Sequence, residues 1–107
     1  MDKKAVLTII SDFAKALEFQ NIKPQQIILF GSYASGQQQE DSDIDLVVIS
    51  NDFKGKDYWQ RIDILSAAIY KVFKPIEAIA ITPEEWQNSD SPIIDRARKG
   101  EVVIGLT

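Results

Sequence analysis

The chain has 107 residues, of which 45% are hydrophobic and 26% are charged, and its formal net charge is −4. These values are typical of one soluble domain with a modest core, and no apolar stretch approaches the length that spans a membrane. The N-terminal segment lacks the pattern of a signal peptide, so we expect a cytoplasmic protein. The negative charge argues against a long nucleic-acid footprint and is compatible with a basic protein partner.

Cysteine and histidine are both absent from the chain. Their absence excludes disulfides, thiolate nucleophiles, serine–histidine triads and almost every zinc or haem site. A metal ion would have to be held by oxygen atoms, which favours magnesium or manganese.

The first half of the chain predicts two helices and two strands. Hydrophobic residues recur at helical spacing over about residues 3–20, which predicts an amphipathic helix. A run of branched residues at about 26–30 predicts a buried strand. Ser32 is placed to cap a short helix through Ser35, and a polar loop follows. A second strand is expected at about residues 43–49.

The second half continues the alternation of helices and strands. Helical spacing predicts a long helix over about residues 58–72, and an apolar run predicts a third strand at about 76–81. The pairs Thr82-Pro83 and Ser91-Pro92 predict the starts of two short helices. A last apolar run lies at about 102–104. The sequence therefore predicts an α/β domain with a mixed sheet of about four strands.

A glycine–serine pair and two aspartates stand on either side of the loop between the first two strands. Gly31-Ser32 follows the first strand, and after ten residues Asp43 and Asp45 begin the second. Residues i and i+2 of a strand point to the same side, roughly 7 Å apart, so the two carboxylates share one face. Such a pair can hold divalent cations, and a glycine–serine turn offers backbone N–H groups to a phosphate. The pattern favours a site for a metal-bound nucleoside triphosphate.

Each part of this pattern has a simpler interpretation when taken alone. Gly31-Ser32 is then a turn, and Asp43 is a cap or a solvated loop residue. The segment 41–45 also resembles the start of a calcium loop, but Leu46 stands where that loop requires glycine. We therefore discard the calcium loop and keep the joint pattern as the hypothesis.

Glu77 is the only acidic residue inside the third apolar run, and it shares a face with Ile79 and Ile81. It is either a third metal ligand or a solvent-exposed residue of an edge strand.

Other residues also have two interpretations. Tyr33 either stacks on a base or packs, and the tryptophans belong to the core or to a partner surface. A basic cluster is either a solvated helix end or a triphosphate clamp. The residues in question are Trp59, Trp86, Arg96, Arg98 and Lys99.

The Gly31-Ser32 pair and Asp43-Ile44-Asp45, ten residues apart, resemble the signature of the minimal nucleotidyltransferases of the DNA polymerase β-like superfamily. The resemblance covers nearly the whole chain and implies one nucleotidyltransferase domain over residues 1–107. It implies that Asp43 and Asp45 hold two magnesium ions, or manganese, and that Gly31 and Ser32 bind the nucleotide phosphates. Glu77 would complete the metal site as the third catalytic carboxylate and general base.

Two positions depart from the pattern of that family. Glu77 stands where the family usually has aspartate, and its side chain is one methylene longer. Ser35 stands where many relatives carry an arginine that can neutralise phosphate charge. Lysine or arginine from a partner could replace that charge.

Minimal nucleotidyltransferases are commonly paired with HEPN proteins as antitoxin and toxin, and can attach AMP to a tyrosine of that partner. The resemblance therefore implies an ATP-using, magnesium-dependent protein adenylyltransferase that acts as an antitoxin. The two departures motivate an alternative, a nucleotide-binding or partner-binding subunit without turnover. Transfer to a small molecule such as an aminoglycoside is a third possibility, which is disfavoured because so short a chain leaves no second domain to bind it.

Overall fold

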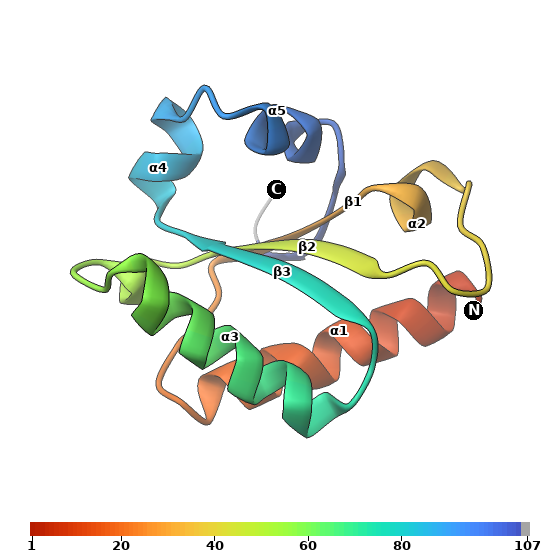
Figure 1. Cartoon of the computed structure of the whole chain (residues 1–107), viewed down its shortest axis with the longest axis horizontal. Helices are drawn as coiled ribbons and strands as arrows, with labels where there is room; N and C mark the ends of the chain where they lie inside the picture. The colour runs from red at the N-terminus through yellow and green to blue at the C-terminus, as the bar shows by residue number, and fades with distance from the viewer. Residues whose placement is uncertain (106–107) are drawn as a thin grey trace.

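The computed structural model describes residues 1–105, in which helices cover both faces of a four-stranded sheet (Figure 1). The strands are β1 (Gln26–Phe30), β2 (Ile44–Ile49), β3 (Ile76–Ile81) and β4 (Glu101–Gly105), and they lie in the order β3-β2-β1-β4. Strand β1 runs antiparallel to both β2 and β4, whereas β2 and β3 run parallel. The mixed four-stranded sheet predicted from the sequence is confirmed.

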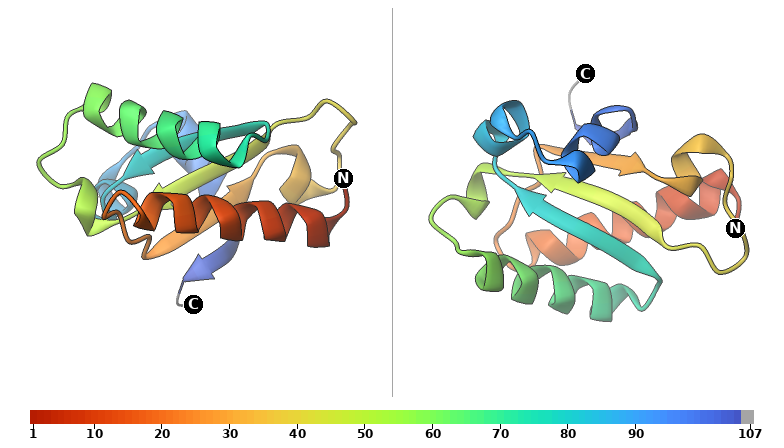
Figure 2. Two further views of the ribbon diagram at one scale, coloured as in Figure 1. Left: turned by 90° about the horizontal axis from the view of Figure 1, so that it is seen from below. Right: turned by 45° about the horizontal axis from the view of Figure 1, so that its top comes forward.

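The helices form a layer on each face of this sheet. The long helices α1 (Lys3–Glu18) and α3 (Tyr58–Val72) lie side by side on one face (Figure 2). The shorter helices α4 (Pro83–Asn88) and α5 (Pro92–Arg98) lie on the other face. The single-turn helix α2 (Ser32–Ser35) follows β1. No helix within the described part of the chain is long and apolar enough to cross a membrane.

Alternate side chains of β1, β2 and β3 build two apolar cores, one on each face of the sheet. The larger core lies under α1 and α3, and the smaller core lies under α4 and α5. The larger core includes Phe13, Leu17, Ile27, Leu29, Leu46 and Val48. The smaller core includes Ile28, Phe30, Val47, Ile49, Ile94 and Ala97. Because Asp45 is two residues from Val47, its side chain lies on the face of the smaller core.

Some predicted details differ in the structure. Helix α1 ends at Glu18 rather than near residue 20, and β2 begins at Ile44, so Asp43 lies just outside the strand. The prediction that Ser32 caps α2 is wrong, because Gly31 occupies the N-cap position and Ser32 is the first helical residue. Gly31 has φ 73°, a conformation that glycine adopts without steric strain, and it therefore makes the turn itself.

Several large aromatic side chains are exposed on α1 and α3 or just after them. Trp59, Tyr70 and Phe73 are 71%, 80% and 81% exposed, and Phe19 is 81% exposed. Trp59 therefore lies on the surface, whereas Trp86 packs against the smaller core. Phe73 ends α3 at φ 57°, a backbone conformation that bulky residues rarely adopt. Exposed apolar groups of this size are typical of surfaces that contact another molecule.

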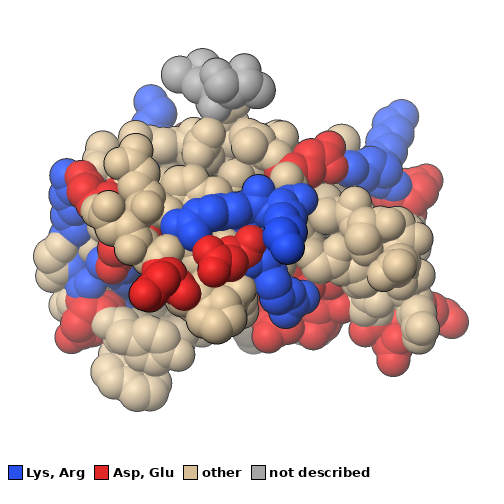
Figure 3. Space-filling view, turned by 90° about the horizontal axis from the view of Figure 1, so that it is seen from above, with Lys and Arg blue, Asp and Glu red and all other residues tan. Residues whose placement is uncertain are grey.

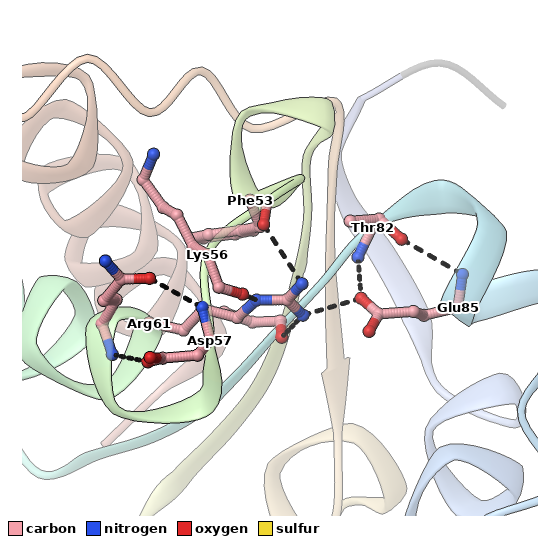
Figure 4. Close-up of polar contacts among 8 residues, drawn as sticks. Phe53, Lys56, Asp57, Arg61, Thr82 and Glu85 are labelled. Carbon is pink, nitrogen blue, oxygen red and sulfur yellow. Dashed lines mark hydrogen bonds and ion pairs between the residues drawn. The ribbon is translucent and has the colours of Figure 1, made fainter.

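Arg61 of α3 covers the free edge of β3 (Figure 4). Its Nη1 donates to the carbonyl oxygen of Ala80 at 3.2 Å and to Glu85 Oε1 at 2.7 Å. Its Nη2 and Nε donate to the carbonyl oxygens of Phe53 and Lys56 at 3.1 and 3.0 Å. Unpaired carbonyl groups on an edge strand are a template for pairing with other chains. Arg61 satisfies one of them and ties α3 to the turn that follows β2.

We expect Glu85→Gln to lower the free energy of unfolding at pH 7 by about 0.5–1 kcal/mol, the range for a partly exposed ion pair. Partial burial raises the pKa of the Glu85 carboxyl, but hydrogen bonds from the Thr82 N–H and Arg61 outweigh it, so the pKa lies below its ordinary value. The ionised carboxylate therefore stabilises the fold at neutral pH, and this contribution is lost as the pH falls through the lowered pKa. Urea unfolding of the unmutated chain and of Glu85→Gln, at pH 7 and at about pH 3, measures the difference in their free energies of unfolding.

Glutamine at position 85 keeps an oxygen that can accept the Thr82 N–H in the helix cap, so the change isolates the charge. Glu84→Gln is the matched control. Its ion pair with Lys54 joins two side chains that are both more than half exposed, so we expect a smaller loss. An equal loss in both variants, or a loss that does not shrink at low pH, would contradict the role given to the Arg61–Glu85 pair.

Candidate active site

Gly31 brings the end of β1 directly against the carboxylate of Asp45. Phe30 pairs with Asp45 in the register of β1 and β2, so the turn that follows Phe30 passes beside this side chain. A Cβ atom at position 31 would lie 2.2 Å from Asp45 Oδ2, far inside van der Waals contact. Together with its positive φ, this contact explains why position 31 requires glycine.

The register of β2 and β3 places a second carboxylate beside Asp45. Asp45 pairs with Glu77 across the two parallel strands, and both residues line a cavity of about 300 Å³ together with Phe30 and Arg96. Asp45 is half-buried, whereas Glu77 is exposed. Asp43 is also exposed and lies just before β2. The structure therefore brings Asp45 and Glu77 into one cavity, whereas Asp43, two residues before Asp45, does not line it.

The carboxylate of Asp45 is affected by burial and by the charges around it. Burial raises the pKa of Asp45 above its ordinary value, and the negative charges of Glu77 and Asp43 raise it further, while Arg96 acts in the opposite direction. A bound cation would relieve this repulsion, and carboxylate oxygens are ligands that suit magnesium or manganese. The donor set therefore fits such an ion. As the side chains stand, no three acidic groups among the described residues are grouped closely enough to bind one ion together.

A second cavity, of about 430 Å³, shares Phe30 and Arg96 with the first. Gly31, Ser32 and Ser35 from the turn after β1 line it, and so do Arg96 and Lys99. The Ser32 hydroxyl can donate a hydrogen bond to a ligand, whereas the Ser35 hydroxyl donates to the Ser32 carbonyl oxygen at 3.3 Å, and the two cations supply positive charge. This cavity is therefore suited to an anion that lies beside the carboxylates.

Gly100 holds the end of α5 against β1. A Cβ atom there would lie 2.3 Å from the carbonyl oxygen of Leu29, so a larger residue would push the two segments apart. Ile94 and Ala97 are buried under the helix, which directs the other side of α5 towards solvent and the cavities. On this face basic and acidic side chains lie close together (Figure 3).

The sequence alone did not separate two roles for the basic cluster of α5. Arg96 and Lys99, the residue that directly follows α5, are three positions apart, and both line the second cavity. That spacing was the available signal, but a basic helix end is common and does not by itself indicate a site. Tyr33 is settled as a packing residue, because its ring is buried in the larger core.

Comparison with known proteins identifies the family of the chain. A sequence profile described as nucleotidyltransferase domain matches residues 10–99, a span that contains the residues lining the two cavities except Gly100. The chain belongs to the nucleotidyltransferase domain family. The matched span of this nucleotidyltransferase domain contains the Gly31-Ser32 pair and the three candidate metal ligands, which are Asp43, Asp45 and Glu77. No curated protein matches the sequence.

Solved structures share the fold of this nucleotidyltransferase domain. A protein from Sulfolobus solfataricus assigned as a nucleotidyltransferase aligns with a TM-score of 0.65 and 19% identity, covering 94% of this chain and 88% of that one. A toxin–antitoxin structure with AMP-PNP aligns with a TM-score of 0.64 and 22% identity, covering 91% and 73%. A mutant of the toxin–antitoxin MntA-HpeT aligns with a TM-score of 0.56 and 17% identity, covering 100% and 76%. These similarities show a common fold.

Proposed function

We propose that this nucleotidyltransferase domain transfers AMP from ATP to a tyrosine hydroxyl of a partner HEPN protein and so acts as its antitoxin. The observation that carries the proposal is the pairing of Asp45 with Glu77 in a cavity that shares Phe30 and Arg96 with the Gly31-Ser32 cavity. The acidic cavity suits the reacting centre, and the adjoining cavity suits the phosphates that leave.

The transfer needs an oxygen nucleophile and a leaving pyrophosphate. The acceptor hydroxyl oxygen forms a bond to the α-phosphorus of ATP while the bond from that phosphorus to the bridging oxygen of the β-phosphate breaks. Pyrophosphate leaves, and the hydroxyl proton passes to a base. Glu77, which is exposed at the cavity wall, is the base we propose. The product is AMP joined to the acceptor oxygen as a phosphodiester.

Asp43, Asp45 and Glu77 would hold two magnesium ions, or manganese, with side-chain rotation completing the site. When bound, the ions would neutralise charge on the phosphates and help to orient the nucleophile and the leaving group. Gly31 contributes by its lack of a side chain, because it leaves room for the Asp45 carboxylate beside the turn. Ser32 would donate hydrogen bonds to phosphate oxygens.

Two observations support a protein as the acceptor. Large aromatic side chains are exposed on α3 and directly after α1 and α3, and such groups are typical of surfaces that contact another molecule. Two structures of the same fold are toxin–antitoxin assemblies, one of them with AMP-PNP. An ATP-dependent antitoxin that acts on a protein in the cytoplasm is consistent with both observations.

Asp43→Asn tests the proposal, because Asp43 is exposed and lies outside the sheet, so its amide should leave the fold unchanged. The experiment adds magnesium and ATP labelled on its α-phosphate to host-cell lysate together with the unmutated chain or the variant. We expect a labelled protein band with the unmutated chain, and a signal weaker by about a hundredfold or more with Asp43→Asn. Unchanged labelling by Asp43→Asn would contradict the proposal.

A second candidate function is a nucleotide-binding or partner-binding subunit without turnover. It is favoured by the spread of the acidic groups, because no three of them within residues 1–105 are grouped to bind one ion as they stand. The same experiment separates the two functions. The absence of any labelled band, with ATP binding still measurable on the pure protein, would favour the non-catalytic subunit.

A further inference from the structure

We infer that Arg96 of α5 and Lys99, which directly follows α5, form a phosphate clamp that binds the β- and γ-phosphates of the nucleotide. This inference rests on the proposed function, since it names the groups that recognise its substrate. It assigns to this chain the positive charge that the turn after β1 lacks, because that turn carries serine at position 35. No cation from a partner is then needed.

Arg96 is the residue that the two cavities have in common on the helix side. It lines the cavity of Asp45 and Glu77 and also the cavity of Gly31 and Ser32. Its guanidinium carbon lies 5.9 Å from the ring centroid of Phe30, which also lines both cavities. The side chain is thus held over the end of β1, between the acidic groups and the serine turn.

The polar groups of both residues are available for a ligand. Within the described residues, neither the guanidinium of Arg96 nor the ammonium of Lys99 has a hydrogen bond or an ion pair, and both side chains are exposed. The guanidinium offers a planar fork of N–H donors and Lys99 a compact charge, and both suit phosphate oxygens. They line the same cavity as Ser32, so an anion in this cavity would lie within reach of the serine turn and of both cations.

Arg98 provides an internal contrast on the same helix. Its Nη2 donates to the carbonyl oxygens of Trp86 and Ser89 at 2.6 and 2.8 Å, and its Nη1 is paired with Asp95. These bonds fasten α5 to the end of α4. Arg98 therefore has a structural role, and it lines neither of the two cavities. Arg98 therefore stabilises the packing of α5, whereas Arg96 and Lys99 are the two basic residues that line the cavity for the phosphates.

The order of the two cations relative to the acidic cavity indicates how the phosphates would lie. A protein with a net charge of −4 repels a triphosphate at long range, so binding depends on local cations. Arg96 is adjacent to the acidic cavity, where the α-phosphate would react, and Lys99 is one helical turn further along. A chain of phosphates that begins at the carboxylates and extends along α5 would meet Arg96 first and Lys99 next.

The test measures binding to the full chain by calorimetry, with magnesium and three probes: ATP, AMP and inorganic tripolyphosphate. The variants are Arg96→Gln, Lys99→Gln and, as the matched control, Arg98→Gln, which removes the same charge from the same helix. We expect Arg96→Gln to weaken ATP and tripolyphosphate binding about tenfold to a hundredfold. Lys99→Gln should weaken both by less, AMP should be affected least, and Arg98→Gln should bind ATP like the unmutated chain. Circular dichroism confirms that each variant is folded.

The outcomes separate the clamp from the proposed function. Unchanged affinity of Arg96→Gln and Lys99→Gln for ATP and tripolyphosphate would overturn the clamp, even if the unmutated chain transfers AMP. An equal loss in Arg98→Gln would also overturn it, because the loss would then follow from net charge or from a loosened α5 and not from the two side chains that line the cavity. Arg96-dependent binding of tripolyphosphate by a chain that transfers no AMP would support the clamp and count against the proposed function.

Discussion

Replacing Gly31 with alanine is expected to lower the free energy of unfolding by about 1–3 kcal/mol and nucleotidyl transfer by about a hundredfold. The backbone term arises because Gly31 has φ 73° and ψ −152°, a conformation that is nearly confined to glycine. The effect on transfer arises because the new methyl group would lie 2.2 Å from Asp45 Oδ2. The carboxylate must move, and a displacement of about 1 Å in a catalytic group is enough for such a loss.

Gly55→Ala is the control for the backbone term. Gly55 has φ 77°, and a Cβ atom there would meet nothing within 4 Å, so alanine strains the backbone without displacing a neighbour. We expect a loss of about 1 kcal/mol in stability and no loss of transfer. Urea unfolding and the labelled-ATP assay, both at a temperature where the variants are folded, measure the two effects. Full transfer by Gly31→Ala would show that the Asp45 carboxylate is not confined as the structure indicates.

The fold was largely predictable because its apolar residues follow regular spacings. Branched runs marked β1, β2 and β3, and the helical spacing of α1 and α3 placed these helices within one or two residues of their observed ends. Local backbone geometry was less predictable. Ser32 is a common capping residue, but the cap at α2 is made by Gly31, whose unusual φ and ψ depend on the packing of Asp45 beside it.

The long-range parts of the site could not be read from the sequence. Strand register decides that Glu77 stands beside Asp45, and a shift of one residue would have turned Glu77 to the opposite face. The contacts of Arg61 could not be predicted either, because its partners lie in the turn after β2, in β3 and in α4. Sequence spacing can show which side chains of one element share a face. It cannot show which elements that face meets.

The different environments of Arg96 and Arg98 follow from packing rather than from residue type. Both are arginines on a seven-residue helix, two positions apart, so a helix places them on different sides. Burial of Ile94 and Ala97 fixes the rotation of the helix, and Gly100 fixes its distance from β1. Arg98 is then directed to the backbone at the end of α4, and Arg96 to the cavities.

Asp45→Asn is expected to lower transfer by about a hundredfold to ten-thousandfold while it stabilises the metal-free protein by up to about 1 kcal/mol. Burial, followed by the charges of Glu77 and Asp43, raises the pKa of Asp45, so the folded protein disfavours the ionised carboxylate. The unmutated chain therefore loses stability as the pH rises through this raised pKa, and the loss persists at pH 7. The uncharged amide of asparagine has the same shape and avoids this loss of stability.

Urea unfolding in a chelating buffer measures this gain, which should shrink as the pH falls below 7 through the raised pKa and Asp45 takes up a proton in the folded protein. Magnesium should reverse the order of stability, because an ion that binds only the folded state adds stability, and the unmutated chain keeps the stronger ligand. An acidic residue that destabilises the empty site and stabilises the loaded one is selected for binding rather than for folding. If Asp45→Asn were less stable than the unmutated chain at pH 7 without magnesium, Asp45 would instead be a structural residue, and its place in the proposed metal site would be lost.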